Sequence, residues 1–139
     1  MRKMPDEWYV YLTQNYLDLI NGNALEYSKL KPSEIPENSG VYLISYGNDE
    51  NEVPYYIGRT KNLRQRLYNN HLMGPLTNAR LKKYLINSGE CINAIEAKKF
   101  IKTNCKIRWI LEKDTRKRGA IEGYVTGMIY PKYGIYEEH

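Results

Sequence analysis

Cysteine, phenylalanine and long apolar runs are all scarce in this sequence. The chain has two cysteines, Cys91 and Cys105, which are too few and too isolated for a disulfide framework or a zinc site. No apolar run is long enough to span a membrane, and no signal peptide is recognisable. We therefore expect a cytoplasmic protein in a reducing compartment, without a membrane partner.

Tyrosine takes the place that phenylalanine usually has, since one phenylalanine stands against fourteen tyrosines. Tyrosine rings can stack on bases, but we expect most of these rings in the core with the hydroxyl group near the surface. The 139 residues, 42% of them apolar and 27% charged, suffice for one folded domain and exclude a disordered chain. The net charge of +5 favours an acidic partner, with nucleic acid as the first candidate and plain solubility as the alternative.

The first 39 residues predict a helix and a linker. Residues 1–22 carry apolar side chains at helical spacing, and Asn21, Gly22 and Asn23 end the pattern. The spaced residues are Trp8, Tyr9, Leu12, Tyr16, Leu19 and Ile20. We expect this helix either to pack on the domain or to serve as a dimerisation or DNA-contact element, with residues 23–39 as a linker.

The middle of the chain predicts a hairpin followed by helices. Residues 40–44 and 53–58 read as antiparallel strands joined by a polar loop, and alternation places Tyr56 on one face with Pro54 and Gly58. Asn62 is suited to cap a helix over 63–68 that runs towards His71 and stops at Gly74-Pro75. Further helices are expected from a Thr77 cap to residue 87 and over 93–102.

The last third predicts a strand over 106–112 and a final helix that begins at Asp114-Thr115. Ile121, Val125, Met128 and Ile129 form its expected apolar stripe, and the glycines at 119, 123 and 127 predict close packing on the sheet. The fold class is therefore α/β: a small, mainly antiparallel three-stranded sheet flanked by helices, with an extra N-terminal helix.

An ordered set of motifs resembles the GIY-YIG nuclease superfamily. The set comprises Gly40-Val41-Tyr42, Tyr56-Ile57-Gly58, Arg66 ten residues after Tyr56, Glu122, and Pro131-Lys132-Tyr133-Gly134. The resemblance covers residues 37 to 136 and divides the chain into an extension, 1–36, and a nuclease-like domain, 37–139. One position departs from the family pattern, because Gly134 stands where asparagine is usual.

The resemblance implies a metal-dependent endonuclease that hydrolyses DNA phosphodiester bonds by a one-metal route. Glu122 would hold Mg²⁺ or Mn²⁺, hard ions that prefer oxygen ligands; a salt bridge to Arg116 or Arg118 is the alternative for this carboxylate. Tyr42 would be the general base, with its pKa brought down from about 10 by Arg59 and Arg66.

The remaining family positions complete the expected site. Arg66 would bind the scissile phosphate, Tyr56 would bond to the water or the phosphate, and Arg59 would assist. His71 stands five residues after Arg66 where four is common, and on a regular helix it would point about 140° away. A structural or DNA-backbone role for His71 is therefore as good an expectation as catalysis.

DNA is the expected partner, with Arg64, Arg80, Lys82 and Lys83 as its backbone contacts. A solvated basic face is the alternative for these four residues. No separate recognition motif is visible, so specificity is left to a homodimer, a separate targeting partner or DNA shape. Two other functions stay open: a nucleic-acid-binding module with weak or no catalysis, and an interaction domain without salt-sensitive DNA affinity.

Overall fold

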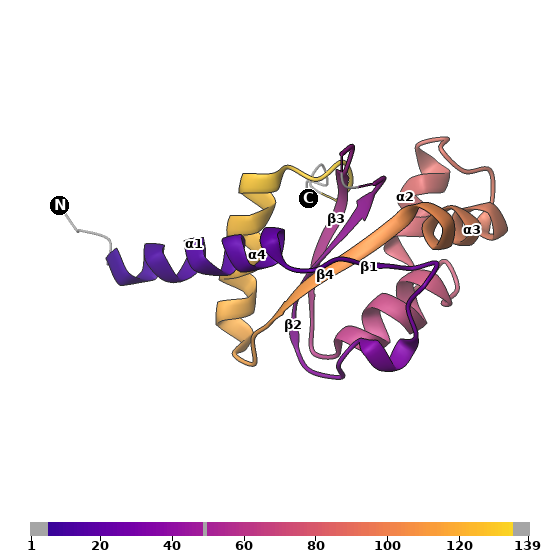
Figure 1. The fold of residues 1–139 in the computed structure, drawn as a ribbon. Helices are drawn as coiled ribbons and strands as arrows, with labels where there is room; N and C mark the ends of the chain where they lie inside the picture. Colours follow the sequence, from indigo (N-terminus) through magenta and orange to yellow (C-terminus); the bar gives the residue numbers. More distant parts are fainter. Residues whose placement is uncertain (1–5, 49, 135–139) are drawn as a thin grey trace.

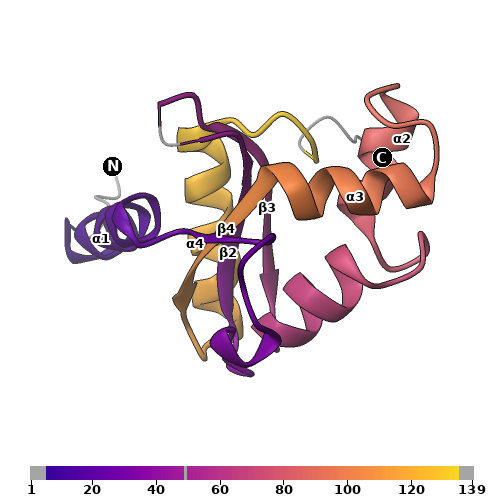
Figure 2. The ribbon, with the colours of Figure 1, turned by 45° about the vertical axis from the view of Figure 1, so that its right-hand side comes forward.

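An antiparallel sheet of four strands separates two layers of helices (Figures 1 and 2). The computed structural model describes residues 6–48 and 50–134. The strands are β1 (Leu25–Glu26), β2 (Gly40–Tyr46), β3 (Val53–Thr60) and β4 (Cys105–Leu111), in the order β1-β4-β2-β3. The three long strands were expected; β1 was not, because two residues inside the expected linker leave no detectable alternation.

The helices are α1 (Asp6–Asn21), the 3-10 turn η1 (Pro32–Glu34), η2 (Gln65–Leu72), α2 (Arg80–Asn87), α3 (Ala94–Asn104) and α4 (Thr115–Ile129). Helices α1 and α4 cover one face of the sheet, and η2, α2 and α3 cover the other (Figure 2). Asp114 caps α4 as expected, because its side chain accepts a hydrogen bond from the Lys117 amide. The expected Thr77 cap is wrong: α2 begins later, with Ala79 at the cap position.

Alternation along β2 divides the core into two clusters. Val41 and Leu43 pack with Leu19, Ile121 and Val125 beneath α1 and α4. Tyr42 and Ile44 face the other layer, where they pack among the side chains of η2, α2 and α3. Strand β2, which is paired on both edges, is thus the centre of the molecule, and Tyr42 is buried in the larger of the two core clusters.

A β-bulge in β3 changes the predicted alternation. Ile44 pairs with Tyr56 and Ser45 pairs with Pro54, so Tyr55 has no partner in the register. Tyr55 and Tyr56 consequently both pack in the larger cluster. The expected grouping of Tyr56 with Pro54 is wrong, since the bulge moves Pro54 to the opposite face.

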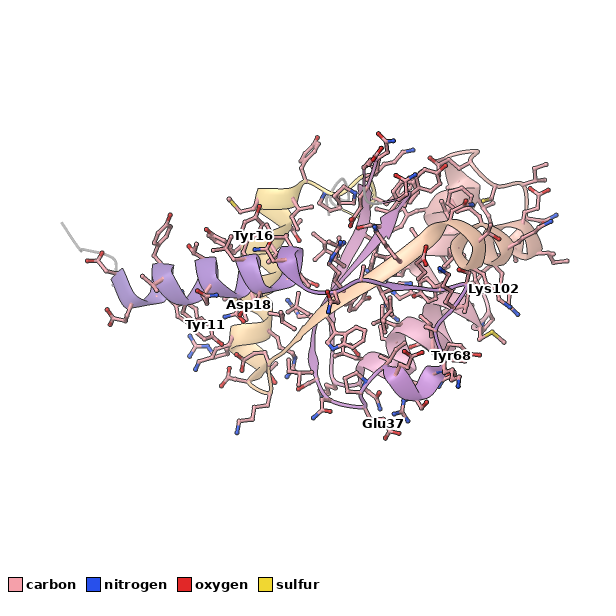
Figure 3. The ribbon with its side chains drawn as sticks, viewed as in Figure 1. Tyr11, Tyr16, Asp18, Glu37, Tyr68 and Lys102 are labelled. Carbon is pink, nitrogen blue, oxygen red and sulfur yellow. The ribbon has the colours of Figure 1, made fainter. Side chains whose placement is uncertain are left out.

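Helix α1 packs on α4 from Tyr11 onwards. Leu19 is fully buried, and Tyr16 meets the ring of Tyr124 edge-on at 6.1 Å. Figure 3 shows Tyr11 and Tyr16 on the part of α1 that lies beside α4. Tyr9, expected on the buried stripe, is 64% exposed, because the first turns of α1 extend past the sheet (Figure 1). None of the helices in the described segments is long and apolar enough to cross a bilayer.

Beyond Gly119, whose Cβ atom would lie 3.1 Å from Nη1 of Arg59 on β3, the glycine face of α4 does not pack on the sheet, so the predicted close packing along this face is wrong. A Cβ atom at Gly123 or Gly127 would have no neighbour within 4 Å. Ile121 and Val125 form the buried stripe instead, and Met128 is 53% exposed. The predicted burial of the apolar stripe and the predicted packing of the glycine face could not both be correct. Ile121 and Val125 are offset by two residues from the glycines, and on a helix of 3.6 residues per turn this offset places the two sets on opposite sides.

Candidate active site

The two motif tyrosines lie side by side, Tyr42 on the internal strand β2 and Tyr56 on the edge strand β3. Tyr42 is 1% exposed and Tyr56 6%, and their ring centroids are 6.3 Å apart. A Cβ atom at Gly58 would lie 2.4 Å from the Tyr42 hydroxyl oxygen and 2.5 Å from Cζ. Gly58 is therefore required, because the Tyr42 ring lies directly on the β3 backbone.

Gly40 has a corresponding packing role at the start of β2. A Cβ atom there would lie 2.1 Å from the carbonyl oxygen of Ile110 on β4 and 3.1 Å from Cδ1 of Leu63. Both motif glycines thus serve the sheet itself. Gly40 lets β4 and Leu63 approach β2 closely, and Gly58 leaves room for the Tyr42 ring.

Helix η2 brings His71 to the same hydroxyl group. Residues 65–72 form a π-helix, the helix type in which amides bond to the carbonyl five residues earlier. The amide of Met73, for example, donates to the carbonyl of Tyr68. His71 is fully buried, and its Nε2 atom lies 2.8 Å from the Tyr42 hydroxyl oxygen. The predicted 140° separation from Arg66 is wrong because it assumed a regular α-helix.

Arg66 completes the surroundings of the Tyr42 hydroxyl. Its Nε atom donates to that oxygen at 3.4 Å, and its Nη1 atom donates to the carbonyl of Asn78 at 3.4 Å. Burial raises the pKa of Tyr42 well above its usual range, and the neighbouring Tyr56 adds to this, while Arg66 opposes it. The expected lowering of this pKa is therefore wrong for the protein alone, and Tyr42 is protonated at neutral pH.

His71 is neutral in the same environment. Burial, first, and the positive charges of Arg66, Lys82 and Arg80 lower its pKa to about 3. Its Nδ1 atom is buried without a hydrogen-bond partner in the described part of the chain. In the tautomer that carries hydrogen on Nδ1, the Nε2 atom accepts a hydrogen bond from the Tyr42 hydroxyl group.

Glu122 pairs with Arg59 across the edge of the sheet. Arg59 Nη1 lies 3.2 Å from Glu122 Oε1, with side chains 52% and 27% exposed, respectively. Loss of solvation raises the pKa of the Glu122 carboxyl, which the Arg59 charge partly offsets. The alternative partners Arg116 and Arg118 are not used: Arg118 instead donates to the carbonyls of Glu112 and Lys113.

A cleft of about 380 Å³ lies beside β3, between α2 in one helical layer and α4 in the other. It is lined by Tyr56, Ile57, Arg80, Tyr84, Glu122, Gly123, Thr126, Pro131, Tyr133 and Gly134. The amides of Lys132 and Tyr133 bond to the carbonyls of Pro54 and Tyr55, so the last segment covers the first half of the β3 edge. Gly134 has a φ of +96°, and a Cβ atom there would lie 3.4 Å from the Tyr56 ring.

Sequence reasoning missed Tyr84 and Tyr133 as cleft residues. Their rings stack with centroids 5.8 Å apart, and the ring centroid of Tyr84 lies 6.2 Å from that of Tyr56. The spacing of four residues between Arg80 and Tyr84 could have indicated one shared helix face. Tyr133 had no such signal, because its position depends on how residues 131–133 pair with β3.

The four predicted DNA contacts have different surroundings. Lys82 is 3% exposed and donates to the Gly74 carbonyl at 3.0 Å, so its expected place on an outer face is wrong. Arg64 pairs with Glu37 at 2.6 Å and donates to the carbonyl of Ile35. Lys83 is exposed, and Arg80 is exposed within the cleft.

The cleft residues fit one divalent cation. Glu122 supplies a carboxylate that has lost part of its solvation, and hard cations prefer such oxygens and keep several waters. Within residues 6–48 and 50–134, no group of three or more His, Cys, Asp or Glu side chains could hold a metal. A cation in this cleft would therefore be held by Glu122 together with substrate oxygens and water.

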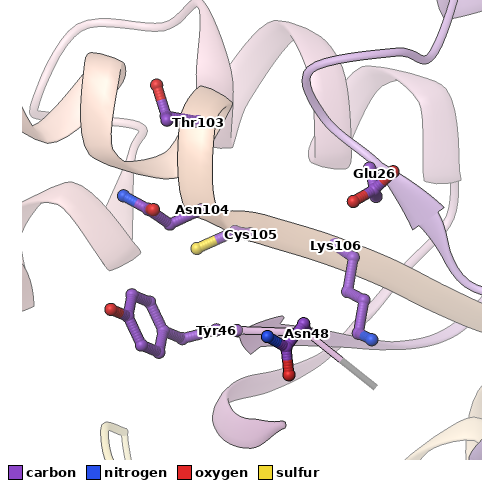
Figure 4. Close-up of a pocket in the computed structure, with 8 residues that line it drawn as sticks. Glu26, Tyr46, Asn48, Thr103, Asn104, Cys105 and Lys106 are labelled. Atoms are coloured by element: carbon purple, nitrogen blue, oxygen red, sulfur yellow. The ribbon is translucent and has the colours of Figure 1, made fainter. Parts of the chain in front are cut away.

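A second hollow shares no residue with the cleft. It measures about 300 Å³ and lies between β1, the end of β2 and the start of β4 (Figure 4). Lys106 in its wall is 4% exposed and pairs with Glu52 at 3.2 Å. Cys105 lines it too, and both cysteines of the chain are buried and free. No predicted catalytic residue lies in this hollow.

Comparison with known proteins identifies the fold family. The family model of the GIY-YIG catalytic domain matches residues 38–125. Solved structures of the GIY-YIG N-terminal endonuclease domain of UvrC from Thermotoga maritima are similar. The form bound to its catalytic divalent cation, magnesium, is 27% identical, covering 73% of this chain and 88% of that one, with a TM-score of 0.45. A tyrosine-to-phenylalanine mutant is 25% identical over 73% and 87%, with the same score.

No curated protein matches the sequence. The family match nevertheless spans more than half of the chain and contains both motif tyrosines, Arg66 and Glu122. The chain therefore belongs to the GIY-YIG family and carries the nuclease domain of that family.

Proposed function

We propose that this protein is a divalent-cation-dependent endonuclease that hydrolyses DNA phosphodiester bonds at the cleft beside β3. One observation carries the proposal: the Tyr42 hydroxyl lies between His71 Nε2, at 2.8 Å, and Arg66 Nε, at 3.4 Å. The three groups come from β2 and η2, and Tyr56 links them to the cleft wall that holds Glu122. Base and phosphate ligand thus meet at one hydroxyl group, and the Glu122 charge is near enough to raise the pKa of Tyr42. The groups that hydrolysis requires therefore come from one side of the sheet and the cleft beside it.

Glu122 is the proposed ligand of a single Mg²⁺ or Mn²⁺ ion. When bound, the ion would supply charge neutralisation on the phosphate and the leaving oxygen. Arg59 now balances the Glu122 charge, and its exposed side chain is free to turn towards solvent or phosphate as the ion takes its place. Arg59 is thereby proposed to assist the site rather than to adjust the pKa of Tyr42.

Tyr42 is the proposed general base, with His71 as its proton acceptor. Because Tyr42 is protonated at neutral pH, its oxygen can take a proton from water only as its own proton moves to His71 Nε2. Positive charges of Arg66 and Arg80 help to keep His71 neutral. A phosphate that enters beside these arginines offsets their charge and makes His71 a better acceptor.

Arg66 and Tyr56 are the proposed phosphate and water ligands. Arg66 is braced by the Asn78 carbonyl, and its guanidinium fork fits two phosphate oxygens. The Tyr56 ring forms part of the cleft surface, where it can bond to the attacking water or to the phosphate.

The alternative function is a DNA-binding module that retains the fold without efficient turnover. Gly134 favours it, because this residue lines the cleft without a side chain where the family usually carries an amide. Arg64, Arg80 and Lys83 would still bind the DNA backbone in that case. Turnover, rather than affinity, distinguishes the two functions.

The extension, partners and location stay predictions. We propose that residues 1–36 are an extension of the nuclease domain at 37–139, with α1 held against α4. A homodimer or a separate targeting partner is proposed to supply specificity, because the sequence shows no separate recognition motif. Double-strand cleavage with one site per chain would also favour a dimer. A cytoplasmic location is likewise a prediction.

The test is cleavage of supercoiled plasmid and of branched and single-stranded oligonucleotides with Mg²⁺ or Mn²⁺, each repeated with a chelator. We expect cation-dependent nicked or linear products that the chelator abolishes. A salt-sensitive gel shift without cleavage of any substrate would instead support the binding module. Equal cleavage with and without the chelator would contradict the cation-dependent route.

A further inference from the structure

Arg80 lies in the cleft rather than on the outer face of α2. It is the first residue of α2 and lines the cleft with Tyr56 and Glu122. Its charge is close enough to lower the pKa of both Glu122 and His71. Arg80 therefore acts on both Glu122 and His71, although it belongs neither to the two motif tripeptides nor to the helix of Arg66.

The Arg80 guanidinium is not committed to any contact. It is exposed, and within the described segments it takes part in no hydrogen bond or ion pair. The other arginines of the site are occupied: Arg59 pairs with Glu122, and Arg66 donates to Tyr42 and to the Asn78 carbonyl. The cleft lining thus holds one carboxylate, Glu122, which Arg59 already balances, and the unpaired charge of Arg80, which is available to an anion.

The two walls of the cleft belong to different helical layers. Glu122 is on α4, on one side of β3, and Arg80 is on α2, on the other side (Figure 2). Tyr84, one turn after Arg80 on α2, lines the same wall. A phosphodiester between the walls would meet the cation ligand from one side and the guanidinium from the other.

We propose that Arg80 is a catalytic residue that binds a non-bridging oxygen of the scissile phosphate from the wall opposite Glu122. The inference rests on the proposed nuclease function and adds a second phosphate ligand to Arg66. A planar fork with several donors can follow the phosphate oxygens as the phosphorus changes geometry, whereas a lysine provides only a point charge.

The experiment compares Arg80→Gln with Lys102→Gln, which removes the same charge from an exposed site on α3 (Figure 3). Single-turnover cleavage is measured at saturating DNA, and affinity for the same DNA is measured in Ca²⁺ over a range of salt. We expect Arg80→Gln to slow cleavage about 100-fold and Lys102→Gln by less than about threefold. Arg80→Lys should recover part of the loss, with unfolding temperatures unchanged.

Affinity gives a readout that does not need turnover. Loss of one phosphate contact should reduce the slope of log affinity against log salt by about 0.9 on duplex DNA, and Lys102→Gln should not change it. If wild type binds but does not cut, the nuclease proposal fails, and an unchanged slope for Arg80→Gln would separately refute the phosphate contact. Cleavage by Arg80→Gln within threefold of wild type, or a loss confined to affinity, would overturn the catalytic role.

Discussion

At the scale of single residues, the site depends on how closely Tyr42 can lie against the backbone of β3. The ring occupies the space that a side chain at position 58 would need. The hydroxyl then reaches His71 and Arg66 together. Side-chain size at one position therefore determines the geometry of the proposed base.

Gly58→Ala should displace the Tyr42 ring and lower both stability and cleavage. We expect a loss of about 1–3 kcal/mol in the free energy of unfolding, as for overpacked cores, together with slower cleavage. Gly127→Ala is the matched control, because its Cβ atom would meet open space and should stabilise α4 by up to about 1 kcal/mol. Urea unfolding of the two variants measures this, and equal stability of Gly58→Ala and wild type would contradict the packing.

His71 should make the protein less stable as the pH falls. Its pKa is about 3 in the folded protein, against about 6.5 when unfolded. Between these values the unfolded chain binds more protons, so the free energy of unfolding decreases as the pH falls below the unfolded pKa. The contribution is lost progressively from about pH 6.5 downwards, by about 2 kcal/mol at pH 5.

The measurement is urea unfolding of wild type and His71→Gln at pH 7 and pH 5. From pH 7 to pH 5, the free energy of unfolding of wild type should fall by about 2 kcal/mol more than that of His71→Gln. His139, the second histidine of the sequence, is present in both and cancels. A difference that is the same at both pH values would mean that His71 can be protonated in the fold.

Several residue-level expectations came directly from the sequence, and others could not. The ordered spacing of Tyr42, Tyr56, Arg66 and Glu122 identified the family, and the Asn62 cap was correct, since its side chain accepts from the Gln65 amide. The burial of Lys82 was not predictable, because an amphipathic pattern does not indicate that Gly74 offers its carbonyl to the ammonium group. The Arg59–Glu122 pair joins residues of two separate elements and left no local pattern.

At the scale of elements, the π-helix η2 accounts for the spacing of Arg66 and His71. Bonding to the fifth residue brings both side chains to Tyr42 with one residue more than an α-helix would need. The sequence did not reveal the helix type of η2, because apolar periodicity over eight residues does not distinguish a π-helix from an α-helix. The β-bulge at Tyr55 was missed for the same kind of reason.

Deleting Asn69 should convert η2 into a regular α-helix without dispersing the site. The spacing between Arg66 and His71 becomes four residues, which also places two side chains on one helix face. Because Asn69 is exposed, we expect cleavage within about threefold of wild type and a stability that is unchanged or higher. Asn69→Ala is the control that removes the side chain and keeps the spacing; a deletion variant that folds but no longer cuts would contradict this account.

At the scale of the whole molecule, the cleft exists because β3 is the edge strand. One half of that edge is covered by residues 131–133, and the cleft occupies the space beside the other half. The α/β class and the three long strands could be predicted from alternation and turn signals. The cleft could not, because it depends on which strand is left at the edge and on how α2 and α4 flank it.

The central claim is that Glu122 supports a cation-dependent cleavage of DNA. The most direct test is the single-turnover rate in Mg²⁺ of wild type, Glu122→Gln and Glu7→Gln, the last an equivalent change on the exposed part of α1. We expect a loss of at least about 100-fold for Glu122→Gln, since the cation ligand is removed, and no change for Glu7→Gln. Cleavage by Glu122→Gln at the wild-type rate would contradict this claim.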